Sequence, residues 1–262
     1  MSFFDKKKIA ILIISRTKSK RLKNKAKLKI KGLNLIEIIL KRLLSKFDKK
    51  NIIICSSSLN NDKSFYKELS KNYDVGTFFG SENNVLKRII DCLEQNKLKH
   101  FVRLTGDNPL VDINAIHKLS LKHIKGKFDY TFTDSLPMGM KSEIFSLEAI
   151  KRNYKKIIDL NSTEYLTYFF RRPDMYKIQK VNFKKLYKNQ NQYKISIDKR
   201  GEFNLLKKFF LKKKNINFSR SEIINFLKKN SKVNKISNKI KFITNKYDVR
   251  YESDQNKFFL LN

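Results

Sequence analysis

The feature that most constrains this chain is the alternation of short apolar runs with segments of helical spacing. Apolar runs typical of strands occupy residues 9–14, 51–55 and 101–105. Between them, apolar residues recur every three or four positions within 33–47 and 81–93, as they do on one face of a helix. This order predicts an α/β fold, a three-layer sandwich in which helices cover both faces of a mostly parallel mixed sheet.

The second half of the chain continues this pattern less regularly. Asp112 is suited to be the N-cap of a helix, and Ser219–Glu222 form a capping box that predicts a short helix through Leu227. We expect further strands at 129–133, 142–146, 176–183 and 193–197, and further helices at 162–170 and 201–213. Clear periodicity ends after residue 230. The sequence therefore predicts one domain over residues 1–230, followed by a tail or small β appendage over 231–262.

Composition predicts a soluble protein of the cytoplasm. No apolar run approaches the roughly 20 residues that span a bilayer, so no membrane partner is expected. Ile9–Ile14 is too short, and too closely followed by charge, to be a signal peptide. Two cysteines, Cys55 and Cys92, stand in apolar settings and do not make a disulfide framework. We expect both to be buried and reduced.

The formal net charge of +35 raises the question of a nucleic-acid partner. The lysines, however, are spread along the predicted helix surfaces and are not gathered with aromatic residues into one groove. We therefore expect only nonspecific binding to polyanions at low salt and no specific nucleic-acid partner.

Charged side chains follow the predicted strands at the points where the strands end. Asp107 follows strand 101–105, and Asp198 follows strand 193–197. A basic loop, residues 15–25, follows strand 9–14 and contains cations at Arg16, Lys18, Lys20, Arg21, Lys23 and Lys25. Ligands of open α/β sheets bind at the carboxyl ends of strands. Cations and carboxylates at that edge suit a nucleoside triphosphate with its magnesium ion.

Each of these groups also has a purely structural interpretation. Asp107 could cap its own turn, and Asp198 could be the N-cap of helix 201–213. A lysine-rich loop is often only a solvated surface, and this one lacks the glycines of a Walker A loop. Asp112 fits a helix cap better than a ligand. The three histidines have no metal-ligand spacing.

Several motifs resemble those of a known enzyme family. The basic loop is similar to the amino-terminal signature of the acylneuraminate and 3-deoxy-manno-octulosonate cytidylyltransferases, and most of all to the branch named for spore-coat polysaccharide biosynthesis. Residues 80–88 resemble a G-S-x-x-D-V-L-x-R segment, and 103–112 resemble R-x-T-G-D-x-P-L-x-D. Weaker matches, in the same order along the chain, are Pro137, Gly139, Glu143, Phe145, Ser146, Glu164, Thr167, Asp198, Glu202 and Phe203. Together the motifs cover roughly residues 8 to 228.

The resemblance implies the Rossmann-like, GT-A-like fold of nucleotide-diphospho-sugar transferases, with residues 1–230 as a nucleotidyltransferase domain. It also implies a reaction in which a hydroxyl of an acidic sugar attacks the α-phosphorus of CTP and pyrophosphate leaves. Asp107 and Asp198 would bind Mg²⁺, and Glu143 would contact the acceptor. CTP would be held by Ser15, Arg16, Ser19, Arg21, Lys25, Ser81 and Arg103. Among these, Arg16, Arg21 and Lys25 would act in catalysis together with Asp107. Related enzymes pair as homodimers, which we expect here as well.

The sequence departs from the family pattern in two places. In the basic loop, Lys18 replaces a glycine and Lys23-Asn24 replaces Pro-Gly, although the cationic anchors remain. On the expected acceptor side, Lys141 replaces an aspartate and Tyr165 a histidine.

Three alternatives remain open at this point. One is a glycosyltransferase of the same fold, although the Asp-x-Asp motif usual after a strand is missing. The second is a basic nucleic-acid-binding module. The third is a family member that binds nucleotide without catalysis. Glu143 could also simply pair with a neighbouring lysine.

Overall fold

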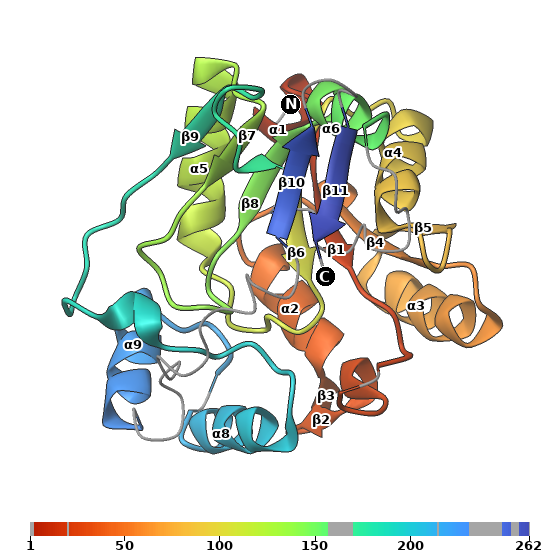
Figure 1. The fold of residues 1–262 in the computed structure, drawn as a ribbon. Coiled ribbons are helices and arrows are strands. Elements are labelled where there is room, and N and C mark those ends of the chain that lie inside the picture. Colours follow the sequence, from red (N-terminus) through yellow and green to blue (C-terminus); the bar gives the residue numbers. More distant parts are fainter. Residues whose placement is uncertain are drawn as a thin grey trace.

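The computed structural model describes residues 3–19, 21–156, 170–213, 215–230, 248–252 and 257–261. Its main sheet has seven strands in the order β5-β4-β1-β6-β8-β7-β9 (Figure 1). The neighbours β5, β4, β1 and β6 are parallel, β8 is antiparallel to both β6 and β7, and β9 is parallel to β7. The strands are β1 Ile9–Ile14, β4 Ile52–Ser57, β5 Gly76–Gly80, β6 His100–Thr105, β7 Tyr130–Phe132, β8 Glu143–Ser146 and β9 Ile178–Lys180. The mostly parallel mixed sheet is thereby confirmed.

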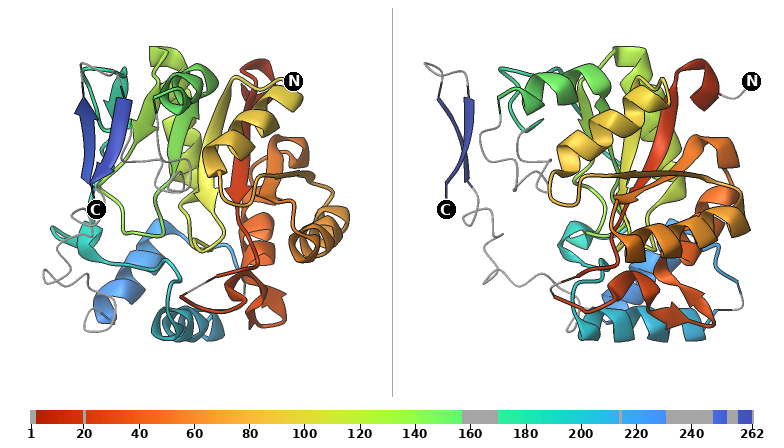
Figure 2. Two further views of the ribbon diagram at one scale, coloured as in Figure 1. Left: turned by 45° about the vertical axis from the view of Figure 1, so that its right-hand side comes forward. Right: turned by 90° about the vertical axis from the view of Figure 1, so that its right-hand side faces the viewer.

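Helices cover both faces of this sheet, as Figure 2 shows. One face carries α2 (Leu35–Leu44), α3 (Asn60–Tyr73) and α5 (Ile113–Gly126), and the other carries α4 (Val85–Gln95) and α6 (Leu147–Tyr154). All six residues of β1 are buried, and they alternate between the two cores: Ile11 packs with the α2 side and Leu12 with the α4 side. A strand buried on both faces requires a continuous apolar run, which is the pattern of residues 9–14.

Two further helices, α8 (Arg200–Leu211) and α9 (Arg220–Lys229), lie beyond the carboxyl ends of the central strands (Figure 1). Ser219 and Glu222 form the predicted capping box at the start of α9. The Asp112 side chain accepts a hydrogen bond from the amide of Ala115 at 2.9 Å, which confirms it as the N-cap of α5. The short elements are α1 Phe3–Lys6, η1 Lys25–Lys27, β2 Lys29–Ile30, β3 Leu33–Asn34, η2 Lys49–Asn51 and η4 Gln190–Gln192.

Near the end of the chain, β10 (Asp248–Glu252) and β11 (Lys257–Leu261) pair as an antiparallel hairpin. The hairpin lies within the stretch for which the sequence predicts a tail or small β appendage. In the described part of the chain, no helix is long and apolar enough to cross a membrane. Cys55 and Cys92 are both buried free thiols, as expected.

The sequence-based prediction was wrong about the last expected strand. Residues 193–197 are extended but do not join the main sheet; Lys194 forms only an isolated bridge with Met138. The structural alternative for Asp198 does not hold either, because Lys199, and not Asp198, is the N-cap of α8. The prediction also omitted α3, β5 and α6. The helix expected at 162–170 lies almost entirely outside the described residues, as do Glu164, Tyr165 and Thr167.

Candidate active site at the carboxyl edge of the sheet

The loops that follow β1 and β6 leave the sheet side by side. Ile14 and Thr105 are register partners at the ends of these strands, and the Gly106 amide donates to the Ile14 carbonyl at 3.1 Å. A Cβ on Gly106 would lie only 2.3 Å from Ser15 Oγ, so a glycine is required where the two loops touch. The basic loop and the turn with Asp107 are therefore in direct contact.

Asp107 is held from two directions. The Thr105 hydroxyl donates to its Oδ1 at 2.6 Å, and Lys25 Nζ lies 2.8 Å from its Oδ2. Lys25 comes from the far end of the basic loop, at the first residue of η1. Asn24, immediately before it, has a φ of 53°, in the left-handed region that asparagine tolerates better than most residues. The replacement of a glycine by Asn24 thus leaves this backbone conformation accessible.

The extended segment 193–197 brings Asp198 to the same place. Its Ile197 amide donates to the carbonyl of Asp107 at 2.9 Å, and its Ile195 amide donates to the carbonyl of Met138 at 2.8 Å. Gly139, with a φ of 92°, lets the neighbouring loop approach, since a Cβ there would lie 2.4 Å from the Ser196 nitrogen. Residues far apart in the sequence are thereby fixed around Asp107.

Asp198 is surrounded by three cations. Its carboxylate lies 2.8 Å from Arg21, 3.0 Å from Lys194 and 3.6 Å from Lys25. Burial tends to raise the pKa of Asp198, but Lys194, Lys25 and Arg21 together lower it below its ordinary value of 3.8. The carboxylate therefore remains charged at neutral pH, ready to hold a cation.

Lys194 is a site residue that sequence reasoning missed. Its ammonium contacts Asp198 and also Glu202 Oε1 at 2.5 Å. The Glu202 carboxylate in turn accepts a hydrogen bond from the Lys199 amide at 2.8 Å, at the start of α8. In the sequence, Lys194, Asp198 and Glu202 follow one another at intervals of four residues, the spacing at which opposite charges pair on a helix. This spacing was the only sequence pattern that could have predicted the contacts of Lys194. It was not informative, because only Glu202 lies on a helix.

The remaining residues that the sequence predicts to bind CTP or the acceptor make contacts of their own. Arg103 donates to Glu143 Oε2 at 2.8 Å across the β6–β8 pair, and the Tyr130 hydroxyl donates to Glu143 Oε1 at 2.5 Å. Ser81 Oγ accepts from the Asn84 amide at 3.1 Å, next to the start of α4. Ser15, Arg16 and Ser19 are half-buried in the basic loop. Glu143 thus pairs with the guanidinium of Arg103 and with the hydroxyl of Tyr130.

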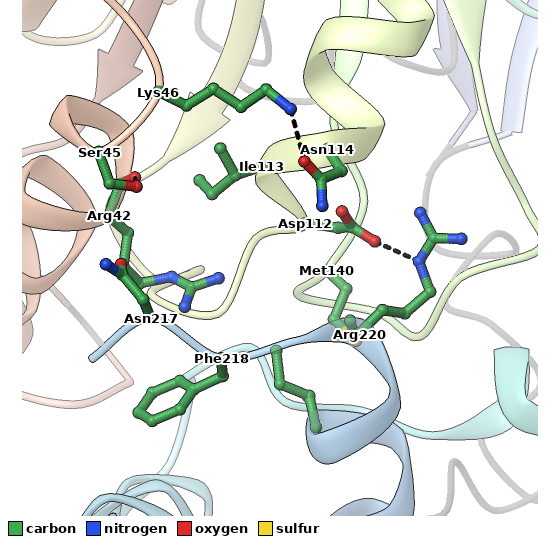
Figure 3. A pocket seen from close by; sticks show the side chains of 11 residues that line it. Arg42, Ser45, Lys46, Asp112, Ile113, Asn114, Met140, Asn217, Phe218 and Arg220 are labelled. Carbon is green, nitrogen blue, oxygen red and sulfur yellow. Dashed lines mark hydrogen bonds and ion pairs between the residues drawn. The ribbon is translucent and has the colours of Figure 1, made fainter. Parts of the chain in front are cut away.

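A separate hollow of about 270 Å³ lies between α2, α5 and α9 (Figure 3). It contains none of the predicted site residues. Most of its charged groups already have partners: Arg220 pairs with Asp112, Lys46 donates to Asn114 at 2.6 Å, and Arg42 donates to the backbone carbonyls of Val111 and Ile216. We therefore place the candidate site around Asp107.

Comparison with known proteins agrees with the fold described above. Residues 10–256 match the model of a family described as cytidylyltransferase. The chain belongs to the cytidylyltransferase family.

Two relatives are similar to this cytidylyltransferase over most of their length. An uncharacterized protein of Methanocaldococcus jannaschii is 32% identical over 238 residues, which is 89% of this chain and 96% of the relative. Spore coat polysaccharide biosynthesis protein SpsF of Bacillus subtilis is 27% identical over 236 residues, covering 85% of this chain and 95% of that protein.

Solved structures share the fold of this cytidylyltransferase. A cytidylyltransferase from Leptospira borgpetersenii has a TM-score of 0.78 at 24% identity, over 88% of this chain and 98% of the other. CMP:2-keto-3-deoxy-manno-octonic acid synthetase, in complex with CTP, has a TM-score of 0.59 at 9% identity, over 78% of this chain and 98% of the other. The family resemblance of the sequence motifs is thus confirmed, and the protein is a CTP-dependent nucleotidyltransferase.

Proposed function

We propose that this cytidylyltransferase transfers CMP from CTP to a hydroxyl of an acidic sugar, for the synthesis of a cell-surface polysaccharide. The observation that carries the proposal is the convergence of Asp107 and Asp198 on one ammonium group, that of Lys25. The name of the Bacillus subtilis relative supports the pathway. The likeness in fold to a synthetase of an acidic sugar nucleotide supports the acceptor class.

In this proposal, Asp107 and Asp198 are the carboxylate ligands of Mg²⁺. Among the described residues, no group of three or more His, Cys, Asp or Glu side chains could hold a metal. Two carboxylates nevertheless fit magnesium, which commonly takes its remaining ligands from water and substrate phosphates. The ammonium group of Lys25 already lies between the two carboxylates, so their oxygens form a site that suits a cation. Bound there, magnesium would neutralise phosphate charge and orient the triphosphate.

The remaining catalytic work is positioning and charge neutralisation. The acceptor hydroxyl oxygen forms a bond to the α-phosphorus as the bond from that phosphorus to the α–β bridging oxygen breaks; pyrophosphate leaves with that oxygen, and the hydroxyl proton passes to water. Arg16, Arg21 and Lys25 bind phosphate oxygens and offset the charge that develops on the departing pyrophosphate. Arg21 is well placed for this role, because its side chain is 67% exposed although it reaches Asp198.

The charges near Glu143 favour an acidic acceptor. Asp134 is contacted by three cations: Lys180 at 3.2 Å, Arg171 at 3.4 Å and Lys141 at 3.6 Å. Lys141 also acts electrostatically on Glu143, which places the two groups in one region. This region carries more positive than negative charge, so it favours a substrate with a carboxylate.

The test is pyrophosphate release by the purified full-length protein with magnesium and each nucleoside triphosphate in turn. Acidic sugars and matched neutral sugars serve as acceptors. We expect release with CTP and an acidic sugar, and a loss of at least about 100-fold in kcat/KM for Asp107→Asn. Asp74→Asn is the matched control, because Asp74 forms only an exposed ion pair with Lys49. Turnover of neutral sugars alone would contradict the acceptor class.

A further inference from the structure

Helix α3 holds the basic loop through a fully buried carboxylate. Asp62 has no exposed surface, and its Oδ1 accepts hydrogen bonds from the Thr17 amide at 2.7 Å and the Thr17 hydroxyl at 2.5 Å. Its Oδ2 accepts from the hydroxyl of Ser57, the last residue of β4. A buried carboxylate is costly unless several donors satisfy it. Asp62 therefore fixes Thr17 to the end of the sheet.

One turn further along α3, Tyr66 holds the loop a second time. Its hydroxyl donates to Ser15 Oγ at 2.7 Å, and its ring is fully buried. Burial raises the pKa of Tyr66 above its ordinary value of 10.0, so the phenol stays neutral and remains a donor. Residues four apart on a helix share one face, which is why Asp62 and Tyr66 reach the same loop.

The two anchored residues, Ser15 and Thr17, stand on either side of Arg16. Ser15 also packs against Gly106, directly before Asp107. The backbone at Arg16 is thus fixed on both sides and has a set position relative to the Asp107 turn. Because its backbone is already fixed, Arg16 loses less conformational entropy when its guanidinium binds a phosphate.

We propose that Asp62 and Tyr66 are positioning residues that set Arg16 for binding the triphosphate of CTP. The inference rests on the proposed role of Arg16 in nucleotide binding. The residues that position the basic loop lie outside it, on the neighbouring helix α3, and we call Asp62 and Tyr66 together the clamp. Neither α3 residue touches the nucleotide in this account, so both act through Arg16.

A double-mutant cycle on the full-length protein separates this role from a merely structural one. The dissociation constant of CTP with magnesium is measured by titration calorimetry for wild type, Tyr66→Phe, Arg16→Ala and the double variant. We expect Tyr66→Phe to weaken binding about fivefold, as the loss of one hydrogen bond does. In the Arg16→Ala background, the same change should weaken binding less than about twofold. Tyr73→Phe is the matched control, because its hydroxyl donates to Glu37 at 3.3 Å and not to the loop.

Asp62 supplies a second arm of the test. Asp62→Asn keeps an oxygen acceptor for Thr17 and an amide that can donate to Ser57, whereas Asp62→Ala removes both. We expect CTP affinity to be near wild type in the first variant and at least about tenfold weaker in the second. Thermal unfolding of each variant verifies folding.

Two results would overturn the inference, and they differ from each other. If wild type fails to bind CTP, the proposed function falls and the clamp has nothing to position. If wild type binds CTP but Tyr66→Phe weakens binding equally with and without Arg16, the proposed function stands and the clamp does not act through Arg16.

Discussion

Replacing Gly106 with alanine tests whether the contact between the two loops positions the site. The added Cβ would lie 2.3 Å from Ser15 Oγ, 2.7 Å from Ser15 Cβ and 2.8 Å from Ile36 Cδ1. Real Cβ atoms do not come this close to other heavy atoms, so one of the loops must move. The turn cannot move easily, because the Gly106 amide is bound to Ile14 and the Asp107 carbonyl to Ile197. Overpacking of this kind costs about 1–3 kcal/mol.

Urea unfolding and pyrophosphate release measure the two consequences. Gly106→Ala should lower the free energy of unfolding by about 1–3 kcal/mol. It should also lower kcat/KM at least about tenfold, because Asp107 is displaced. Gly201→Ala is the control: nothing lies within 4 Å of its added Cβ, and Gly201 is in helix α8. That variant should gain about 0.5 kcal/mol in stability and keep its activity.

The clash predicts a specific non-additivity. Ser15→Gly removes both Ser15 atoms that the new Cβ would meet. In that background, Gly106→Ala should cost less than about half of what it costs in wild type. Equal costs in the two backgrounds, or no cost in wild type, would refute the account of this contact.

Two further predictions concern titratable groups. Burial lowers the pKa of His123 to about 3 and that of His100 to about 4, both below the ordinary value of 6.5. Both histidines therefore take up a proton near pH 6.5 in the unfolded chain but stay neutral in the folded one, so stability is full well above pH 6.5 and falls by about 4 kcal/mol between pH 7 and pH 5. Urea unfolding at both pH values checks this, and an unchanged stability would contradict it. Separately, Lys194→Gln should raise the pKa of Asp198 toward 3.8, as measured by NMR titration, because the variant removes a cation that lowers it.

Elements with a strong apolar pattern were predictable from the sequence. The runs of β1 and β6 and the apolar stripes of α2 and α4 reflect burial against a central sheet. Helix α3 was missed because only Asp62, Tyr66 and Leu69 of its 14 residues are buried, so its apolar stripe is weak. Strand β5 was missed because it is an edge strand whose residues are at most half-buried.

The position of the candidate site was predictable from the sequence, but the ion pairs between its side chains were not. Asp107 and Asp198 could be placed at one edge because each ends an extended run, even though residues 193–197 do not join the sheet. The pairing of Lys25 with both carboxylates depends on how the basic loop folds back, which no local pattern encodes. The pairing of Arg103 with Glu143 similarly depends on the antiparallel register of β6 and β8.

Whether Asp107 helps to hold the metal-bound nucleotide is tested most directly by the affinity for CTP with and without magnesium, measured by calorimetry for wild type and Asp107→Asn. We expect magnesium to tighten CTP binding at least about tenfold in wild type and to leave the CTP affinity of the variant nearly unchanged. In the presence of a chelator, the variant should bind CTP at least as well as wild type, because it lacks one negative charge. An equal gain from magnesium in both proteins would contradict the claim that Asp107 helps to hold the metal-bound nucleotide.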